Sequence, residues 1–166
     1  MTRRPQDDTI KWYRLGLRHL RVARCLLGLG FYDAAVFHAY HAYECGVSAV
    51  IAANGYEVPP WGGRASSPLG ARGIEYSCRG GNVIEPSTHQ ARISMFNKLA
   101  DHTESYYRIH ERLQRYVQTK RSESLYLDRN TGTLPHENLS TAFAEQLTTR
   151  VREFAKALWS DMRLYR

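Results

Sequence analysis

The sequence predicts an all-α protein, a four- to five-helix up-and-down bundle with one long crossover loop rich in glycine, proline and arginine. Apolar residues recur at helical spacing between residues 31 and 54 and in three further stretches of the chain. Glycine and proline are instead concentrated between residues 56 and 86. The 166 residues suffice for one core, so we expect a single domain over residues 1–166 with a loop insertion at about 56–86.

The composition narrows the classes of function without choosing among them. The chain has 23 basic and 16 acidic residues and a formal charge of +7, which attracts phosphates or acidic proteins. Its three cysteines are widely spaced, so neither a disulfide framework nor a zinc ribbon is expected. No apolar run reaches about 18 residues, and acidic residues near the amino terminus stand where a signal peptide has its apolar segment. We therefore expect a cytoplasmic protein with no membrane partner.

The first helix is expected from Asp7 to about Leu27, with acidic and capping residues at its start. Its basic side chains recur at steps of four and three: Arg14, Arg18 and Arg21. They form a stripe about 10 Å long, which is either a solvated face or a contact surface for phosphates. Glycines at 28 and 30 end the helix, so that it forms an antiparallel hairpin with the next one.

Residues 31–54 are expected to form one long buried helix. One stripe of this helix consists of small residues: Ala35, Ala39, Ala42, Gly46, Ala49 and Ala53. The neighbouring stripe consists of bulky residues: Val36, Tyr40, Tyr43, Val47 and Val50. Another backbone can approach the small stripe closely, and the combined apolar face is wider than a surface helix needs. The pattern therefore indicates the central helix of a bundle.

Three polar residues interrupt this helix at steps of three, namely His38, His41 and Glu44. On a buried helix such groups need partners or water. One interpretation places the histidines at a helix boundary and pairs Glu44 with an arginine from a neighbouring helix. The other is a metal or catalytic site. Metal sites in bundles take such ligands from more than one helix, and only this helix offers them, so we expect no metal and no cofactor.

Residues 56–86 are expected to be a loop, since the segment exceeds the usual connection in a compact domain. Short extended pieces are compatible with four of its residues: Ile74, Tyr76, Val83 and Ile84. Its interspersed arginines are either a phosphate-binding set or ordinary surface: Arg64, Arg72 and Arg79.

A third helix is expected to open at Ser87 or Thr88 and to continue for about eight turns to Val117. Its basic residues are candidates for binding nucleic acid or phosphate: Arg108, Arg112, Arg115 and Lys120. Tyrosines stand beside them and offer surfaces for base stacking: Tyr106, Tyr107 and Tyr116. The alternative is an ordinary solvated face.

The connection after Lys120 includes Gly132 and Pro135, which exclude an uninterrupted helix. The last helix is expected to be capped by Ser140 or Thr141. Its apolar positions make a single stripe: Phe143, Leu147, Val151, Phe154, Leu158 and Met162.

The first two expected helices resemble the HEPN family of small helical bundles, which occur with minimal nucleotidyltransferases, in toxin–antitoxin pairs and in defence systems. The matching text is Trp12 and, over residues 17–44, LRHLRVARCLLGLGFYDAAVFHAYHAYE. Weaker similarity follows at residues 88–90 (THQ) and 121–128 (RSESLYLD). The family's usual lysine after the helix-two glutamate is missing, since Cys45 and Ser48 occupy that turn.

In catalytic members of this family, an arginine and a histidine from both chains of a dimer share one cleft, so the resemblance implies that this chain, if active, is a metal-independent endoribonuclease. Such a histidine activates the RNA 2′-hydroxyl, and the arginine stabilises the phosphate. One placement of this motif uses Arg121 with Tyr126, a tyrosine where histidine is expected. The other uses Arg129 with His136, although Gly132 and Pro135 interrupt the helix that holds both residues in the family. We favour the first placement, which predicts binding with little nuclease activity, because tyrosine is a poor base near neutral pH.

Two functions remain as hypotheses. The first is a homodimeric HEPN protein of a toxin–antitoxin or defence module that binds RNA or a nucleotide, with ribonuclease activity undecided. The second is a non-catalytic helical interaction protein that binds an acidic partner, such as a nucleotidyltransferase-like antitoxin.

Overall fold

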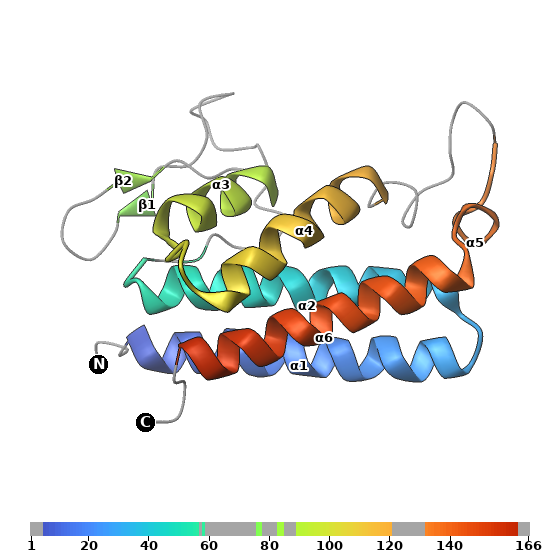
Figure 1. Cartoon of the computed structure of the whole chain (residues 1–166), viewed down its shortest axis with the longest axis horizontal. Coiled ribbons are helices and arrows are strands. Elements are labelled where there is room, and N and C mark those ends of the chain that lie inside the picture. Colours follow the sequence, from blue (N-terminus) through green and yellow to red (C-terminus); the bar gives the residue numbers. More distant parts are fainter. Residues whose placement is uncertain are drawn as a thin grey trace. The chain divides into compact units, whose positions relative to one another are not determined.

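The computed structural model describes residues 5–56, 58, 76–77, 83–84, 89–120 and 132–162. These residues form six α-helices and one small hairpin (Figure 1): α1 (Pro5–Gly28), α2 (Tyr32–Ala53), β1 (Tyr76–Ser77), β2 (Val83–Ile84), α3 (His89–Leu99), α4 (Ser105–Lys120), α5 (Pro135–Asn138) and α6 (Thr141–Asp161). The all-α class is therefore confirmed, whereas the expected number of four to five helices is too low for the described residues.

The chain divides into two compact units. Unit 1 consists of Met1–Tyr13 and Val47–Asp101, and unit 2 consists of Arg14–Gly46 and His102–Arg166. Most of α1 and α2, together with all of α4, α5 and α6, belong to unit 2.

The turn between α1 and α2 is a Schellman motif, as the glycines predicted. Gly30 adopts a φ of +82°, which a residue with a side chain rarely tolerates. Its N–H donates to the carbonyl of Leu27 at 3.1 Å, and the N–H of Phe31 donates to the carbonyl of Leu26 at 2.9 Å. These two bonds satisfy carbonyl groups at the end of α1, so the turn stops the helix and reverses the chain.

The second helix is buried, as its sequence pattern predicts. Every residue from 42 to 52 is buried, and so are Ala35 and Ala39 of the small stripe. Only the last small residue, Ala53, is exposed. All five bulky residues of the neighbouring stripe are buried as well. A second positive-φ glycine, Gly55 at +85°, closes the helix in the same way as Gly30.

Glycines let the helices of unit 2 approach closely. A Cβ atom at Gly16 of α1 would lie 3.1 Å from the carbonyl oxygen of Ala42 and 3.1 Å from the Cβ of Cys45. At Gly46 of α2 it would lie 2.6 Å from the ring of Phe154 on α6. The small stripe of α2 thus receives neighbouring groups at close range, which is the role expected of it.

The expected single third helix is wrong, because the chain breaks between Ala100 and Glu104 into α3 and α4. Asp161 stabilises the start of α4 from the far end of α6. Its Oδ2 accepts hydrogen bonds from the hydroxyl of Ser105 at 2.5 Å and from the N–H of Tyr106 at 3.1 Å. A carboxylate in this position satisfies an otherwise unpaired N–H and complements the helix dipole.

Helices α4 and α6 pack side by side and antiparallel in unit 2 (Figure 1). Tyr116 joins their other ends: its hydroxyl donates to Gln146 at 3.0 Å, its ring stacks on Phe143, and Arg150 lies over the ring at 5.1 Å. The two ends of α4 are therefore fixed to α6 by different kinds of contact.

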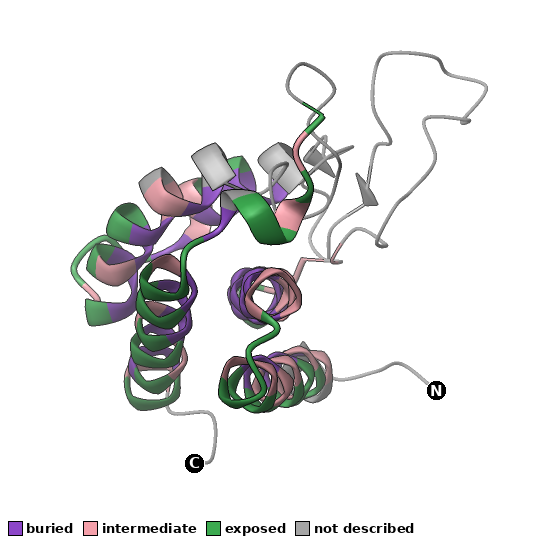
Figure 2. Cartoon of the chain, turned by 90° about the vertical axis from the view of Figure 1, so that its right-hand side faces the viewer, coloured by how far each residue is buried: buried purple, intermediate pink, exposed green. Residues whose placement is uncertain are grey.

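The amino end of α6 is capped by Ser140, one of the two expected residues, whose Oγ accepts from the N–H of Phe143 at 3.2 Å. Figure 2 shows that α6, the helix ending near the label C, keeps its buried residues on one side. Four of the six predicted stripe positions are buried: Leu147, Val151, Phe154 and Leu158.

In unit 1, the only described part of the expected loop with regular structure is the pair of strands β1 and β2. They are antiparallel, and Tyr76 pairs with Ile84 while Ser77 pairs with Val83. The extended pieces considered at Tyr76, Val83 and Ile84 are thus present. The three loop arginines and Ile74 lie outside the described residues.

Candidate nucleic-acid interface

The first helix carries an exposed stripe of arginines. Arg14, Arg18 and Arg21 are all exposed, while Gly16, Leu20 and Ala23 on the other side of the helix are buried. No acidic residue occurs between Asp8 and Asp33 in the sequence. We call Arg14, Arg18 and Arg21 the arginine stripe. It presents three guanidinium groups to solvent without a carboxylate from its own helix turn to neutralise them.

The fourth helix bears only part of the expected nucleic-acid surface. Arg108 and Arg112 are exposed on α4, whereas the side chains of Arg115 and Lys120 lie outside the described part of the structure. Tyr106 and Tyr107 are buried, at 5% and 9% exposure, so the expected base stacking on these two rings is wrong. Both rings lie on the side of α4 that also carries the buried residues His110 and Leu113.

The predicted catalytic motif falls mostly outside the described residues. Arg121, Tyr126 and Arg129 belong to the undescribed segment. His136 is exposed on the short helix α5, which begins at Pro135. Gly132 has a φ of +69°, and residues 132–134 are not helical, so the expected interruption before His136 is confirmed. The structure therefore leaves both placements of the motif as predictions.

The polar residues of α2 form a cluster with a histidine that the sequence alone did not associate with them. Glu44 is buried, and its Oε1 accepts from the hydroxyl of Tyr40 at 2.6 Å, while its Oε2 lies 3.6 Å from Nδ1 of His41. His19 of α1 approaches from the other side, with its Nδ1 3.0 Å from Nδ1 of His38. Its ring centroid lies 5.5 Å from that of His41.

Burial and neighbouring positive groups disfavour the protonated forms of His19 and His38. Burial lowers the pKa of His19, and the neighbouring His41, His38 and Arg18 lower it further. Burial and His41 likewise lower the pKa of His38. One ring in the His19–His38 contact must accept the hydrogen bond that the other donates, which requires at least one unprotonated nitrogen. In the described part of the chain, no group of three or more potential ligands is placed to hold a metal ion.

A fully buried histidine, His110, lies in the core of unit 2. Nδ1 of His110 is 2.8 Å from the hydroxyl of Tyr43, and the two rings stack. Burial raises the pKa of Tyr43, so its hydroxyl keeps its proton and forms a neutral hydrogen bond with the imidazole. Burial also lowers the pKa of His110 to about 4, against the opposing effect of a hydrogen bond with Gln114. The pair is a neutral core contact, too enclosed to serve a substrate.

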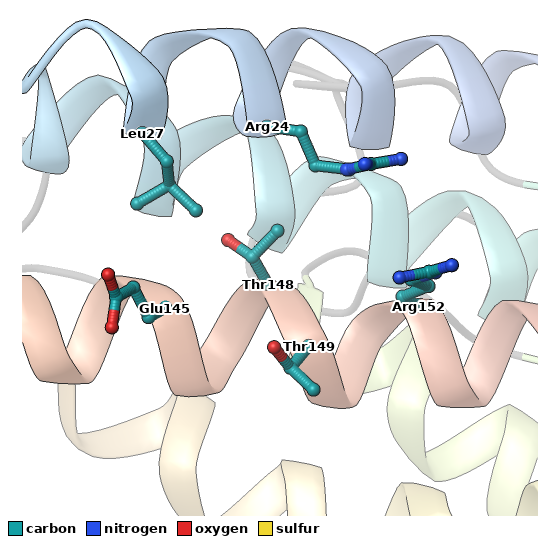
Figure 3. Close-up of a pocket in the computed structure, with 6 residues that line it drawn as sticks. All are labelled: Arg24, Leu27, Glu145, Thr148, Thr149 and Arg152. Carbon is teal, nitrogen blue, oxygen red and sulfur yellow. The ribbon is translucent and has the colours of Figure 1, made fainter.

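A groove between α1 and α6 of unit 2 brings together two arginines that no sequence pattern linked (Figure 3). Its volume is about 330 Å³, and it is lined by Arg24, Leu27, Glu145, Thr148, Thr149 and Arg152. Figure 3 shows the guanidinium groups of Arg24 and Arg152 at one end of the groove and Glu145 at the other. Helical spacing predicts that the four lining residues on α6, from Glu145 to Arg152, share one face of that helix. Their meeting with Arg24 depends on the packing of α1.

No described helix is long and apolar enough to cross a membrane. No curated protein and no solved structure matches the chain. The family model of the HEPN domain, however, matches residues 10–69, which include most of α1, all of α2 and the arginine stripe. This match confirms the resemblance noted for Trp12 and residues 17–44. Residues 10–69 of this chain are therefore similar to the HEPN domain.

Proposed function

We propose that this chain is an RNA- or nucleotide-binding HEPN protein of a toxin–antitoxin or other defence module, acting as a cytoplasmic homodimer. The observation that supports RNA binding most directly is the arginine stripe, whose three side chains are exposed within an acid-free stretch of the family-matched segment. Guanidinium groups bind phosphate through two parallel hydrogen bonds, and they keep their charge at any physiological pH.

The stripe suits a nucleic-acid backbone better than a single small anion. Arg14, Arg18 and Arg21 cover two turns of helix, about 10 Å along its axis. A chain of phosphates offers several charges over such a length, and each contact releases condensed counterions. Exposed Arg108 and Arg112 on α4 of the same unit provide further positive charge.

The RNA-binding proposal is tested with the variant Arg18→Gln/Arg21→Gln, binding being measured on a single-stranded RNA at low salt. We expect weaker binding by about tenfold or more, because two charge-assisted contacts are lost. The matched control is Lys98→Gln/Lys156→Gln, which removes the same charge from two exposed lysines on α3 and α6. Equal losses in the two variants would show that net charge, and not the stripe, governs binding.

The alternative function, binding of an acidic protein partner, uses the same exposed arginines. It predicts that RNA does not bind even at low salt, while a nucleotidyltransferase-like antitoxin does. Failure of RNA to bind the wild-type chain under these conditions would therefore replace the leading proposal by this one.

Ribonuclease activity is a separate part of the proposal. If Arg129 and His136 act, the purified protein should cut RNA in excess chelator and leave cyclic phosphate ends, and His136→Ala should abolish cutting. If Arg121 and Tyr126 occupy the motif, little cutting is expected, because an ordinary tyrosine pKa near 10 makes a poor base. Cleavage that survives His136→Ala would exclude this histidine as the base.

A further inference from the structure

The groove between α1 and α6 has the features of a binding site for a small anion. Arg24 and Arg152 approach it from different helices of unit 2, and both side chains are exposed to solvent. Neither forms an ion pair with a described carboxylate. Two neighbouring guanidinium groups repel one another, and an anion between them relieves this repulsion, so the arrangement favours a negatively charged ligand.

The other end of the groove has the opposite character. Glu145 offers a carboxylate there, and Leu27 contributes an apolar surface beside it (Figure 3). Thr149 is exposed and brings a hydroxyl group. Thr148 already donates its hydroxyl proton to the carbonyl of Ala144 at 2.8 Å, so toward a ligand it presents an acceptor and a methyl group. A ligand that fits is anionic at one end and a hydrogen-bond donor at the other.

The size of the groove limits this ligand to a small molecule or one residue of a polymer. A volume of about 330 Å³ lies at the low end of the range for small-molecule sites. A phosphomonoester meets the charge requirement, since its dianion accepts hydrogen bonds from two guanidinium groups at once. A nucleobase or sugar attached to it carries N–H or O–H donors for Glu145.

We propose that this groove binds a small phosphomonoester of single-nucleotide size, with its phosphate between Arg24 and Arg152 and its donor groups toward Glu145. The lining of the groove does not include Arg14, Arg18 or Arg21, although Arg24 lies one helical turn after Arg21 on α1. The proposal therefore does not rest on RNA binding by the stripe.

The test is titration of the full chain, by calorimetry, with inorganic phosphate, the four ribonucleoside 5′-monophosphates, and the matching nucleosides. We expect at least one monophosphate to bind, inorganic phosphate to bind more weakly, and the nucleosides not to bind. Arg24→Gln and Arg152→Gln should each weaken monophosphate binding by about tenfold or more. The corresponding lysine variants should lie in between, because lysine keeps the charge but lacks the planar fork.

Two controls separate this site from its surroundings. Arg108→Gln removes an exposed positive charge on α4 outside the groove, and Arg14→Gln/Arg18→Gln removes two from the stripe at positions more than one helical turn from Arg24. Both should leave monophosphate affinity within about twofold. Weakening by these controls equal to that of Arg152→Gln, or no binding of any phosphate probe at millimolar concentration, would overturn the proposal.

Glu145→Gln gives opposite expectations for the two classes of probe. Removing its negative charge should strengthen binding of inorganic phosphate, whereas loss of the carboxylate acceptor should weaken binding of the monophosphate several-fold. Parallel changes for both probes would contradict the proposed orientation. If RNA with a 5′-phosphate competes with the monophosphate and RNA with a 5′-hydroxyl does not, the natural ligand is the 5′ end of an RNA. If neither RNA competes, the natural ligand is a free mononucleotide.

Discussion

At the scale of single residues, histidines in unit 2 have two different environments. His110 is wholly buried against Tyr43, whereas His19, His38 and His41 form a half-buried cluster between α1 and α2. In both places the surroundings disfavour the protonated form of at least one imidazole. The sequence marked His38, His41 and Glu44 as unusual, but it did not show that His19 completes the group.

These environments predict a stability that falls with decreasing pH. The pKa of His110 is about 4 in the folded chain and near 6.5 when unfolded, so between these values only the unfolded chain gains the proton. The contribution of neutral His110 to stability is therefore complete above pH 6.5. As the pH falls toward 4, the free energy of unfolding should decrease by up to about 3 kcal/mol. The lowered pKa values of His19 and His38 act in the same direction.

Urea unfolding at pH 7.5 and at pH 4.5 measures this effect. His110→Gln keeps a neutral polar side chain but has no proton to gain, so its stability should depend less on pH than that of the wild-type chain. His136→Gln, at an exposed position on α5, serves as the control and should behave like the wild-type chain. Identical pH dependence in His110→Gln and in the wild-type chain would refute the assignment.

At the scale of elements, the helices of unit 2 are positioned by close contacts and by caps from distant parts of the chain. Gly46 lets Phe154 and Leu158 of α6 approach α2, and Asp161 at the end of α6 caps the start of α4. Both interactions connect residues far apart in the sequence. A single substitution disrupts each of these two interactions, and its effect on stability differs from the effect that helix propensity alone predicts.

Gly46→Ala should destabilise the protein even though alanine favours a helix. The added Cβ would lie 2.6 Å from the Phe154 ring and 2.9 Å from Leu158 Cδ1, and overpacking of this kind costs about 1–3 kcal/mol against a propensity gain of about 1 kcal/mol. Gly28→Ala is the matched control, because nothing lies within 4 Å of its Cβ position. Chemical denaturation should show a loss for the first variant and no loss for the second.

Asp161→Ala should destabilise the start of α4. It leaves the Ser105 hydroxyl and the Tyr106 N–H without their common acceptor, at a cost of about 1 kcal/mol. Asp161→Asn keeps an acceptor oxygen and should cost less, and Glu153→Ala, an exposed acid on the same helix, should cost little. Equal losses in the free energy of unfolding for Asp161→Ala and Glu153→Ala would contradict the capping role of Asp161.

At the scale of the whole molecule, the sequence predicted what depends on local patterns. The burial of α2, the glycine turn after α1 and the cap at Ser140 all follow from neighbouring residues. The break between α3 and α4 did not, because the apolar spacing continues across it and Asp161, which stabilises the new helix start, lies 55 residues beyond Tyr106. The pairing of Arg24 with Arg152 likewise depends on tertiary packing.

The distribution of charge along the chain underlies the proposed function. The family-matched segment includes a run without acidic residues, and the arginine stripe in this run is exposed to solvent on α1. The proposed function depends on this stripe binding phosphates of RNA. A basic surface that merely keeps the protein soluble would show no dependence on the position of its charges.

The salt dependence of RNA binding tests this claim most directly. The affinity of the wild-type chain for single-stranded RNA should fall as salt rises, and the slope of log affinity against log salt should become shallower by about 1.4 in Arg18→Gln/Arg21→Gln, at about 0.7 per lost phosphate contact. Lys98→Gln/Lys156→Gln should keep the wild-type slope. The same slope in all three proteins, or the same change in both variants, would contradict the assignment of the RNA backbone to the arginine stripe.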